Sequence, residues 1–298
     1  MAYIWPLASP RHDIGAVLSR AVAHHAPSKK ATEENFPVAS LLLPASKRAT
    51  IMAYYHFARH ADDIADSPSL SAEDKVAGLD ALDAALHGRD TSSPGLELAL
   101  AYRHEVLEAP AMIEHASQLL HAFRRDAVRD YCEDWGDLMT YCRYSAAPVG
   151  RFLLDLHGES HDTFLPSDAL CAALQVLNHL QDCGKDYAQL RRVYIPRDWM
   201  LAVGLTNDVL EASALRPELR QVIDRTLDAT DGLIELARPL SAMIQDTRMR
   251  IQAAMTFQVA ERLSRRLRTG DPLAERVKLT GMDSALILVT GLYHGLMA

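Results

Sequence analysis

Apolar side chains recur every three to four positions along most of the chain, which is the spacing of a helix packed on one face. In residues 46–66, for example, Ile51, Tyr54 and Ala58 follow this period, and Pro68 closes the segment. Similar patterns predict helices at 11–25, 71–86, 119–130, 134–158, 217–237 and 239–267, with others starting at Pro94, Pro110 and about residue 284. A long helix is predicted between a cap at 166–168 and the break at Pro196.

Strand signals are missing from this pattern. There is no sustained alternation of apolar and polar residues, no Asn-Gly hairpin and no glycine-rich phosphate loop. No internal repeat, low-complexity tract or linker-like change of composition divides the chain. The sequence therefore predicts an all-α protein, with at least ten helices and no sheet beyond two short strands, in a single domain spanning residues 1–298.

Composition narrows the class of protein. At 298 residues the chain can bury a large core, and its 49% of apolar residues include no run of membrane-spanning length. The first residues lack the pattern of a secretory signal, and the four cysteines show no zinc-type spacing, which favours reduced thiols in the cytoplasm. A net charge of −8 argues against nucleic acid as a partner.

Two aspartate pairs are the strongest chemical signal. Asp62 and Asp66 lie four residues apart in one predicted helix, and Asp182 and Asp186 repeat the spacing in another, one turn after Asn178. Residues four apart share a helix face. Two such helices facing each other would surround one cavity with carboxylates, with the Asn178 carbonyl as a further ligand. Such an oxygen-lined site suits Mg²⁺, which bridges carboxylates to substrate phosphates.

Basic side chains accompany both pairs. Arg59 lies one turn before Asp62, and Arg192 follows the second pair. A guanidinium binds phosphate oxygens in a bidentate manner. The alternative for both is a surface ion pair, and a lone aspartate pair is usually a solvated helix face. We interpret Cys183 as a buried filler and the nearby histidines His56, His60 and His179 as structural.

Several separated stretches resemble the squalene/phytoene synthase family of head-to-head isoprenoid synthases, over about residues 35–279. The resemblance is carried by Phe36, Pro44 and Arg48; Tyr55-x-x-x-Arg59-x-x-Asp62-x-x-x-Asp66; Asp126; Tyr141 to Gly150; Gln175-x-x-Asn178-x-x-x-Asp182-x-x-x-Asp186; and Arg192-x-Tyr194-Ile195-Pro196. It implies a helical bundle around a central cavity, a prenyl diphosphate substrate and Mg²⁺ as cofactor.

The resemblance also suggests roles for individual residues. The diphosphate would be bound by Arg59, Arg192 and Tyr194, and a dry cavity for the carbocation would be walled by Phe36, Tyr55, Tyr141, Val149, Leu177 and Leu180. Gly150 would let the backbone approach the substrate. Three residues are candidates for holding an attacking water: Asn35, Asp126 and Gln175.

Within the family, residues 34–40 and 141–150 are most similar to the hydroxysqualene-forming branch of bacterial hopanoid pathways. Condensing members usually carry a serine where Asn35 stands, and often an arginine where Gln181 stands. Both residues are expected to bind substrate, and the departures favour an enzyme that handles one diphosphate, presqualene diphosphate, rather than two.

Two alternatives remain open from the sequence. The chain could condense two prenyl diphosphates head to head, or it could be a non-catalytic homologue that serves as an assembly factor. All four motif aspartates and both arginines are present, which argues against the second. A reductive squalene synthase is disfavoured by the absence of a dinucleotide-binding motif. Peripheral contact with the inner face of the membrane is also left open.

Overall fold

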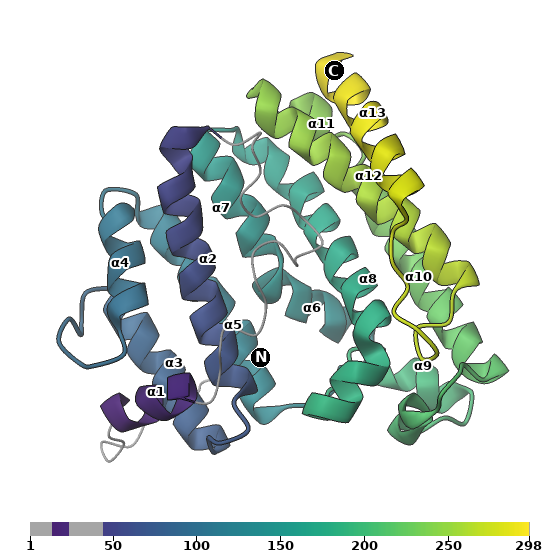
Figure 1. The fold of residues 1–298 in the computed structure, drawn as a ribbon, viewed down its shortest axis with the longest axis horizontal. Helices are drawn as coiled ribbons and strands as arrows, with labels where there is room; N and C mark the ends of the chain where they lie inside the picture. The colour runs from purple at the N-terminus through teal and green to yellow at the C-terminus, as the bar shows by residue number, and fades with distance from the viewer. Residues whose placement is uncertain (1–13, 24–43, 298) are drawn as a thin grey trace. The chain divides into compact units, whose positions relative to one another are not determined.

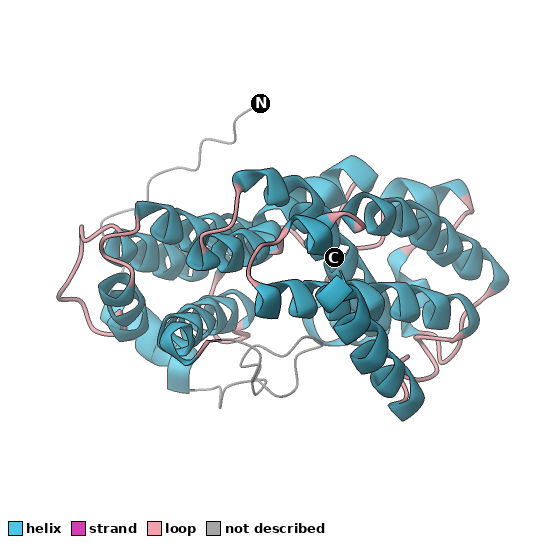
Figure 2. Cartoon of the chain, turned by 90° about the horizontal axis from the view of Figure 1, so that it is seen from above, coloured by secondary structure: helices cyan, strands magenta, loops and turns pink. Residues whose placement is uncertain are grey.

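The computed structural model describes residues 14–23 and 44–297. Within this part of the chain it contains thirteen α-helices, two short 3-10 helices and no strand (Figures 1 and 2). One isolated parallel bridge joins Tyr131 and Val193. The all-α class and the expected number of helices are thereby confirmed.

The chain separates into two compact units, Met1–Val128 and Arg129–Ala298, here called unit 1 and unit 2. The single domain expected from the sequence stays a prediction.

Unit 1 is a small helical cluster around α2. Helix α2 packs against α3, α4 and α5, and α1 lies against α2 and α3. Its core includes Phe57, Leu82 and Tyr102, and the Tyr102 hydroxyl donates a hydrogen bond to the Met112 carbonyl at 2.8 Å. The helices of unit 1 are α1 (Ile14–Ala23), α2 (Ala45–Asp66), α3 (Ala72–Leu86), α4 (Glu97–Glu105) and α5 (Pro110–Val128).

Unit 2 is built around its longest helix, α8. Helices α6, α7, α10 and α12 all pack against α8, and α13 lies along α12 (Figure 1). Its elements are α6 (Trp135–Ser145), α7 (Ala147–His157), η1 (His161–Thr163), α8 (Phe164–Leu190), α9 (Arg197–Ala202), η2 (Asn207–Glu211), α10 (Pro217–Ala237), α11 (Leu240–Met243), α12 (Thr247–Thr269) and α13 (Gly281–Met297).

Several helix boundaries follow the capping signals of the sequence. The Ser71 hydroxyl accepts a hydrogen bond from the Asp74 amide at 3.1 Å, as the predicted cap of α3 requires. Pro166 lies inside the first turn of α8, two residues after its start, rather than at the cap. Proline is tolerated there because first-turn amides have no acceptor within the helix.

Two boundary predictions are wrong. The segments starting at Pro110 and at residue 119 form one continuous helix, α5. The helix predicted over 239–267 is interrupted at Gln245 and Asp246, where both backbone amides donate to the Glu159 carboxylate at 2.8 Å. A buried carboxylate from another segment thus replaces two helical hydrogen bonds, and Asp246 then caps α12 by accepting from the Met249 amide.

The four cysteines, all within the described residues, are free thiols. None of the described helices combines the length and the apolar character needed to cross a bilayer.

Candidate active site

Helix α2 presents the first aspartate pair away from the core of unit 1. Phe57, Ala61 and Ile64 form its buried stripe. The predicted site residues of this helix are spaced i, i+4, i+7 and i+11, share the other side and are half-buried: Tyr55, Arg59, Asp62 and Asp66. The helix therefore brings these four predicted residues onto one face.

The counter-ion of Asp62 comes from its own helix. Arg59 Nη1 lies 2.9 Å from Asp62 Oδ2, and Arg59 Nε lies 3.7 Å from Asp63 Oδ1. Pairs at this spacing are worth roughly 0.3–0.5 kcal/mol on a helix surface. The pair holds the Arg59 guanidinium beside the carboxylates of α2.

The other predicted residues outside unit 2 are placed less completely. Asp126 is half-buried near the end of α5, the helix that packs on α2. Asn35 and Phe36 lie outside the described residues, so their roles stay predictions.

Helix α8 carries the second aspartate pair in the same manner. Its buried stripe includes Ala173, Val176 and Leu177. Opposite this stripe, at i, i+3, i+7 and i+11, four predicted residues share one half-buried face: Gln175, Asn178, Asp182 and Asp186. Each unit thus contributes one polar face, and the expectation that the two faces meet at one cavity stays a prediction.

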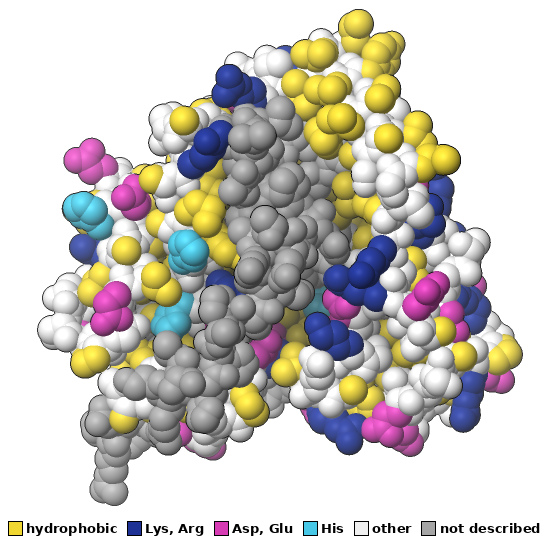
Figure 3. Space-filling view, in the orientation of Figure 1, with side chains coloured by type: hydrophobic (Ala, Val, Ile, Leu, Met, Phe, Trp, Pro, Cys, Tyr) yellow, Lys and Arg dark blue, Asp and Glu magenta, His cyan; other side chains and the backbone are white. Residues whose placement is uncertain are grey.

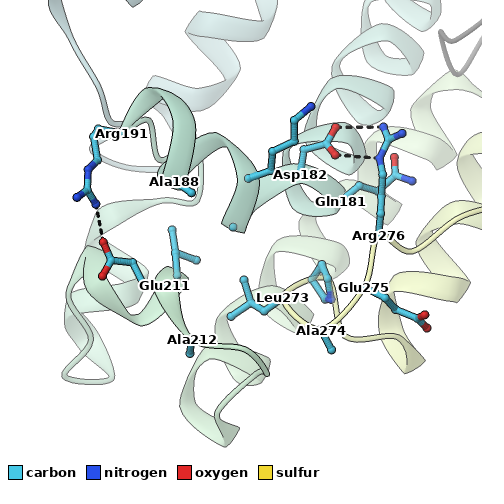
Figure 4. A pocket seen from close by; sticks show the side chains of 14 residues that line it. Gln181, Asp182, Ala188, Arg191, Glu211, Ala212, Leu273, Ala274, Glu275 and Arg276 are labelled. Atoms are coloured by element: carbon cyan, nitrogen blue, oxygen red, sulfur yellow. Dashed lines mark hydrogen bonds and ion pairs between the residues drawn. The ribbon is translucent and has the colours of Figure 1, made fainter.

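The counter-ion of Asp182 comes from a distant segment. Arg276, between α12 and α13, makes a two-point ion pair with it, Nε to Oδ1 at 2.8 Å and Nη2 to Oδ2 at 3.1 Å (Figure 4). The Asp182 side chain is only 13% exposed, whereas Arg276 is 36% exposed. Its bidentate geometry makes this pair stronger than the Arg59–Asp62 pair on α2.

Gln181 holds the same segment in place. Its amide nitrogen donates to the Val277 carbonyl at 2.5 Å, and both residues are buried. The side chain expected to bind substrate therefore contacts the backbone next to Arg276. A buried hydrogen bond of this kind is worth about 1 kcal/mol, and leaving its acceptor unsatisfied costs more.

A cavity of about 580 Å³ lies beside Asp182. It is bounded by α8, the end of η2 and residues 272–276, and Figure 4 shows Asp182 and Arg276 at one end and Arg191 with Glu211 at the other. Five charged side chains besides Asp182 line this cavity, whereas Asn178 and Asp186 do not. Its lining suits ions or water better than an isoprenoid chain.

An aromatic cluster flanks the α8 aspartates. The His179 ring stacks on Tyr194, with centroids 3.6 Å apart, and Tyr141 lies within 5.8 Å of the His179 ring. The hydroxyls of Tyr141 and Tyr194 are 3.5 Å apart. The structure thus brings together two predicted catalytic tyrosines from α6 and from the segment after α8.

His179 also connects two polar residues of this face. Its Nε2 lies 3.1 Å from the Gln175 amide nitrogen, and its Nδ1 lies 3.9 Å from Asp186 Oδ2. Because an amide nitrogen only donates, Nε2 is the acceptor of this hydrogen bond. His179 therefore orients the Gln175 amide and lies near one motif carboxylate, whereas the sequence interpretation treated it as structural.

Arg192 is held by the end of α8. Arg191 ends the helix in the left-handed conformation, with φ of 56°, and the Arg192 amide donates to the Asp186 carbonyl. The next residue, Val193, pairs with the backbone of residues 130–132. This short extended stretch fixes Arg192, which is 7% exposed, and Tyr194 next to the second aspartate pair.

Gly150 has a packing role that the sequence interpretation did not include. A β-carbon at this position of α7 would come within 2.7 Å of Ser167 Oγ and Cys171 Sγ on α8. Glycine is therefore needed for close packing of α7 on α8, and its approach to a substrate stays a prediction. Val149, the preceding residue, is half-buried on another side of α7 and stays a predicted cavity wall.

The residues that could hold a divalent cation are oxygen donors, which fits Mg²⁺. They are Asp62, Asp66, Asn178, Asp182 and Asp186. The neighbouring Cys183 thiol is buried, and burial raises its pKa to about 12, so it stays protonated at neutral pH. Among the described residues, no three acidic, His or Cys side chains form a ready metal cluster. The Mg²⁺ site stays a prediction that needs both aspartate helices.

Comparison with known proteins places these features in context. A profile of the squalene/phytoene synthase family matches residues 29–283. A hydroxysqualene synthase of Rhodopseudomonas palustris is 45% identical over 84% of this chain and 85% of its own. One from Zymomonas mobilis is 45% identical over 82% of each chain. A phytoene synthase of Mycobacterium tuberculosis is 33% identical over 61% of this chain and 59% of its own.

Solved structures agree on the fold. A squalene synthase from Alicyclobacillus acidocaldarius, 31% identical, superposes with a TM-score of 0.67 over 86% of this chain and 93% of its own. A dehydrosqualene synthase bound to a ligand, 22% identical, gives 0.74 over 96% and 97%. The second likeness bears on the fold alone.

Proposed function

Because the chain belongs to the squalene/phytoene synthase family and is an enzyme of that family, we propose that it converts presqualene diphosphate and water into hydroxysqualene and diphosphate. This step would serve hopanoid biosynthesis. The observation that carries the proposal is the 45% identity to two hydroxysqualene synthases, against 33% to a phytoene synthase over a shorter part of the chain.

The reaction breaks the carbon–oxygen bond of the diphosphate and forms a carbon–oxygen bond to water. The leaving group takes the electron pair, the cyclopropane rearranges, and the attacking water loses one proton. No carbon is reduced, so the reaction needs no hydride donor. Mg²⁺ bound by Asp62, Asp66, Asn178, Asp182 and Asp186 would neutralise charge on the departing diphosphate.

We propose that side chains of this protein bind the diphosphate and stabilise the carbocation. Arg59, Arg192 and Tyr194 are proposed to donate to diphosphate oxygens, and preorganised donors of this kind lower an ionisation barrier. Arg192 is buried and fixed by its neighbours, so little entropy is lost when it binds. Tyr141 and Tyr194 present aromatic faces from one cluster, where a cation on carbon is stabilised.

The attacking water has three candidate holders, Asn35, Asp126 and Gln175. The Gln175 amide nitrogen is engaged by His179, which leaves its carbonyl oxygen to accept a hydrogen bond from water. A carbonyl can orient water but cannot take its proton. The departing diphosphate, a strong acceptor, is the base that we propose for this proton.

The experiment uses purified protein, Mg²⁺ and presqualene diphosphate in ¹⁸O-labelled water without NADPH. We expect an alcohol carrying the label. Unlabelled alcohol, or rapid formation of presqualene diphosphate from farnesyl diphosphate alone, would support the condensing alternative instead. A protein inert toward both substrates would favour the assembly-factor alternative.

The proposed setting is the cytoplasm, with peripheral contact at the inner face of the membrane that receives the lipid product. Four free thiols and an acidic chain are consistent with the first part.

A further inference from the structure

The C-terminal helix α13 has two apolar sides, and one of them is exposed. Along one side, Asp283, Ile287, Gly291 and Gly295 are buried against α12, at a spacing of four residues. The two glycines make this contact close, because a β-carbon on either would lie within 2.5 Å of an α12 atom. This packing fixes which side of α13 faces outward.

The outward side forms a continuous apolar stripe. Its residues are spaced i, i+4, i+7, i+11 and i+14, and they are 42–76% exposed: Met282, Leu286, Val289, Tyr293 and Leu296. Of the thirteen exposed large hydrophobic residues in the described part of the chain, seven lie on α13. Figure 3 shows hydrophobic side chains gathered over this helix. Monomeric soluble proteins rarely leave such a patch without a partner.

Charge distinguishes this region from the rest of the chain. Residues 247–297 contain eight arginines and lysines and four acidic residues, whereas the whole chain carries −8. Gly295, near the C-terminal end of α13, packs against Ile251 of α12. The exposed Arg248 lies one turn before Ile251 and therefore flanks this end of α13. The exposed Lys278 lies just before its other end, and Arg265, which is 66% exposed and 3.7 Å from Glu261, lies toward the same end. The single acidic residue of α13, Asp283, is bonded to Arg266.

We infer that the exposed stripe of α13 docks on the surface of an anionic phospholipid bilayer. An apolar helix side with cations at both ends matches a headgroup layer above acyl chains. A symmetric contact with a second copy would instead set the same basic flanks against each other. The exposure of the α13 stripe and the charge of its flanks do not depend on the proposed function. Only the preference for a lipid partner rests on it.

The test is vesicle co-sedimentation of the full chain without substrate, so its outcome does not depend on turnover. We expect binding to phosphatidylglycerol vesicles and weaker binding to phosphatidylcholine. A double variant, Val289→Glu with Tyr293→Glu, should lower the partition coefficient by roughly tenfold or more. The matched control is Leu201→Glu with Leu236→Glu, two residues that are 53% and 60% exposed on other helices of unit 2. It should stay within about twofold of wild type.

A conservative variant covers the case in which the double variant misfolds. Tyr293→Trp should show a blue shift of its emission with vesicles and quenching by brominated acyl chains. Wild-type protein that stays in the supernatant, or a control variant that loses binding equally, would overturn the proposal. So would a wild-type dimer that V289E/Y293E converts to a monomer without a change in vesicle binding, which would assign the stripe to self-association.

Discussion

Helices α2 and α8 carry the same aspartate spacing in different surroundings. Three residues before the first aspartate, α2 has Arg59, which pairs with Asp62, and α8 has His179, which stacks on Tyr194. The residue just before that aspartate is the buried Ala61 on α2, whereas on α8 it is Gln181, which bonds to Val277.

The two aspartates therefore obtain their counter-ions differently. Asp62 has a local partner three residues away, and Asp182 has Arg276, which is 94 residues away in sequence. A local pair exists wherever the helix exists. A distant pair exists only when the segment before α13 is correctly packed, so the α8 pair depends on tertiary structure and the α2 pair does not.

Removal of divalent cations tests what the two pairs share, and it should have the largest effect. Excess chelator should abolish turnover at neutral pH, and added Mg²⁺ should restore it, because both pairs are proposed to supply oxygen ligands to Mg²⁺. Product formation by chromatography is the measurement. Full turnover in chelator would contradict the proposed role of both pairs.

Asp62→Asn and Asp182→Asn test whether the two pairs are equivalent in catalysis. An amide keeps the volume but removes the charge of a ligand, so each variant should lose roughly a hundredfold in turnover, which is about 3 kcal/mol. Asp224→Asn, on the exposed side of α10, is the matched control and should retain normal activity. Near-normal turnover with normal melting in both site variants would refute the assignment.

The difference between the pairs also explains what could be predicted from the sequence. The two faces followed from residues four apart on a helix, and the Arg59–Asp62 ion pair was weighed from the sequence only as the alternative to phosphate binding. Arg276 gave no such signal, because its contact depends on the path of residues 270–280, which no local periodicity fixes. The same holds for Glu159, which interrupts a predicted helix by accepting two amides more than 80 residues away. The sequence shows that His179 lies within the second aspartate motif. Its stacking on Tyr194 is visible only in the structure.

Gln181→Ala places on α8 the same residue type that precedes Asp62 on α2, where it is Ala61. The variant tests directly how much the Gln181–Val277 hydrogen bond stabilises the fold. The variant leaves the buried Val277 carbonyl without this donor and creates a small cavity. We expect a loss of about 1–3 kcal/mol in unfolding free energy, measured by urea titration. The reverse change on α2, Ala61→Gln, cannot serve as a control, because a larger side chain at this buried position destabilises the protein by overpacking. Gln181→Met is the better control, since it roughly keeps the volume and removes the donor without adding a charge.

Arg276→Gln should affect the two aspartate helices unequally. It removes the cation that competes for Asp182 in the absence of metal, so Mg²⁺ should bind about fivefold more tightly, corresponding to about 1 kcal/mol for a partly exposed pair. The measurement is titration calorimetry with Mg²⁺ and no substrate. Arg276→Lys, which keeps the charge, should bind Mg²⁺ as wild type does. Weaker binding in Arg276→Gln would show that Arg276 supports the site rather than competes for it.

The residue after the first aspartate allows the finest comparison, because it is Asp63 on α2 and Cys183 on α8. Burial raises the pKa of the Cys183 thiol from 9.0 to about 12. The folded protein thus holds the thiol protonated, and the stability from this group is complete below pH 9 and is lost as the pH rises toward 12. At pH 10 the loss is on the order of 1 kcal/mol. Cys183→Ala removes the group, so the difference in unfolding free energy between wild type and variant should be constant below pH 8 and change by about 1 kcal/mol at pH 10 in favour of the variant. Asp63→Asn, the matched change on α2, removes no thiol and should show no such pH dependence. A constant difference between wild type and Cys183→Ala up to pH 10 would mean that the thiol ionises in the folded protein as easily as in the unfolded chain, and therefore that this side of α8 opens to water.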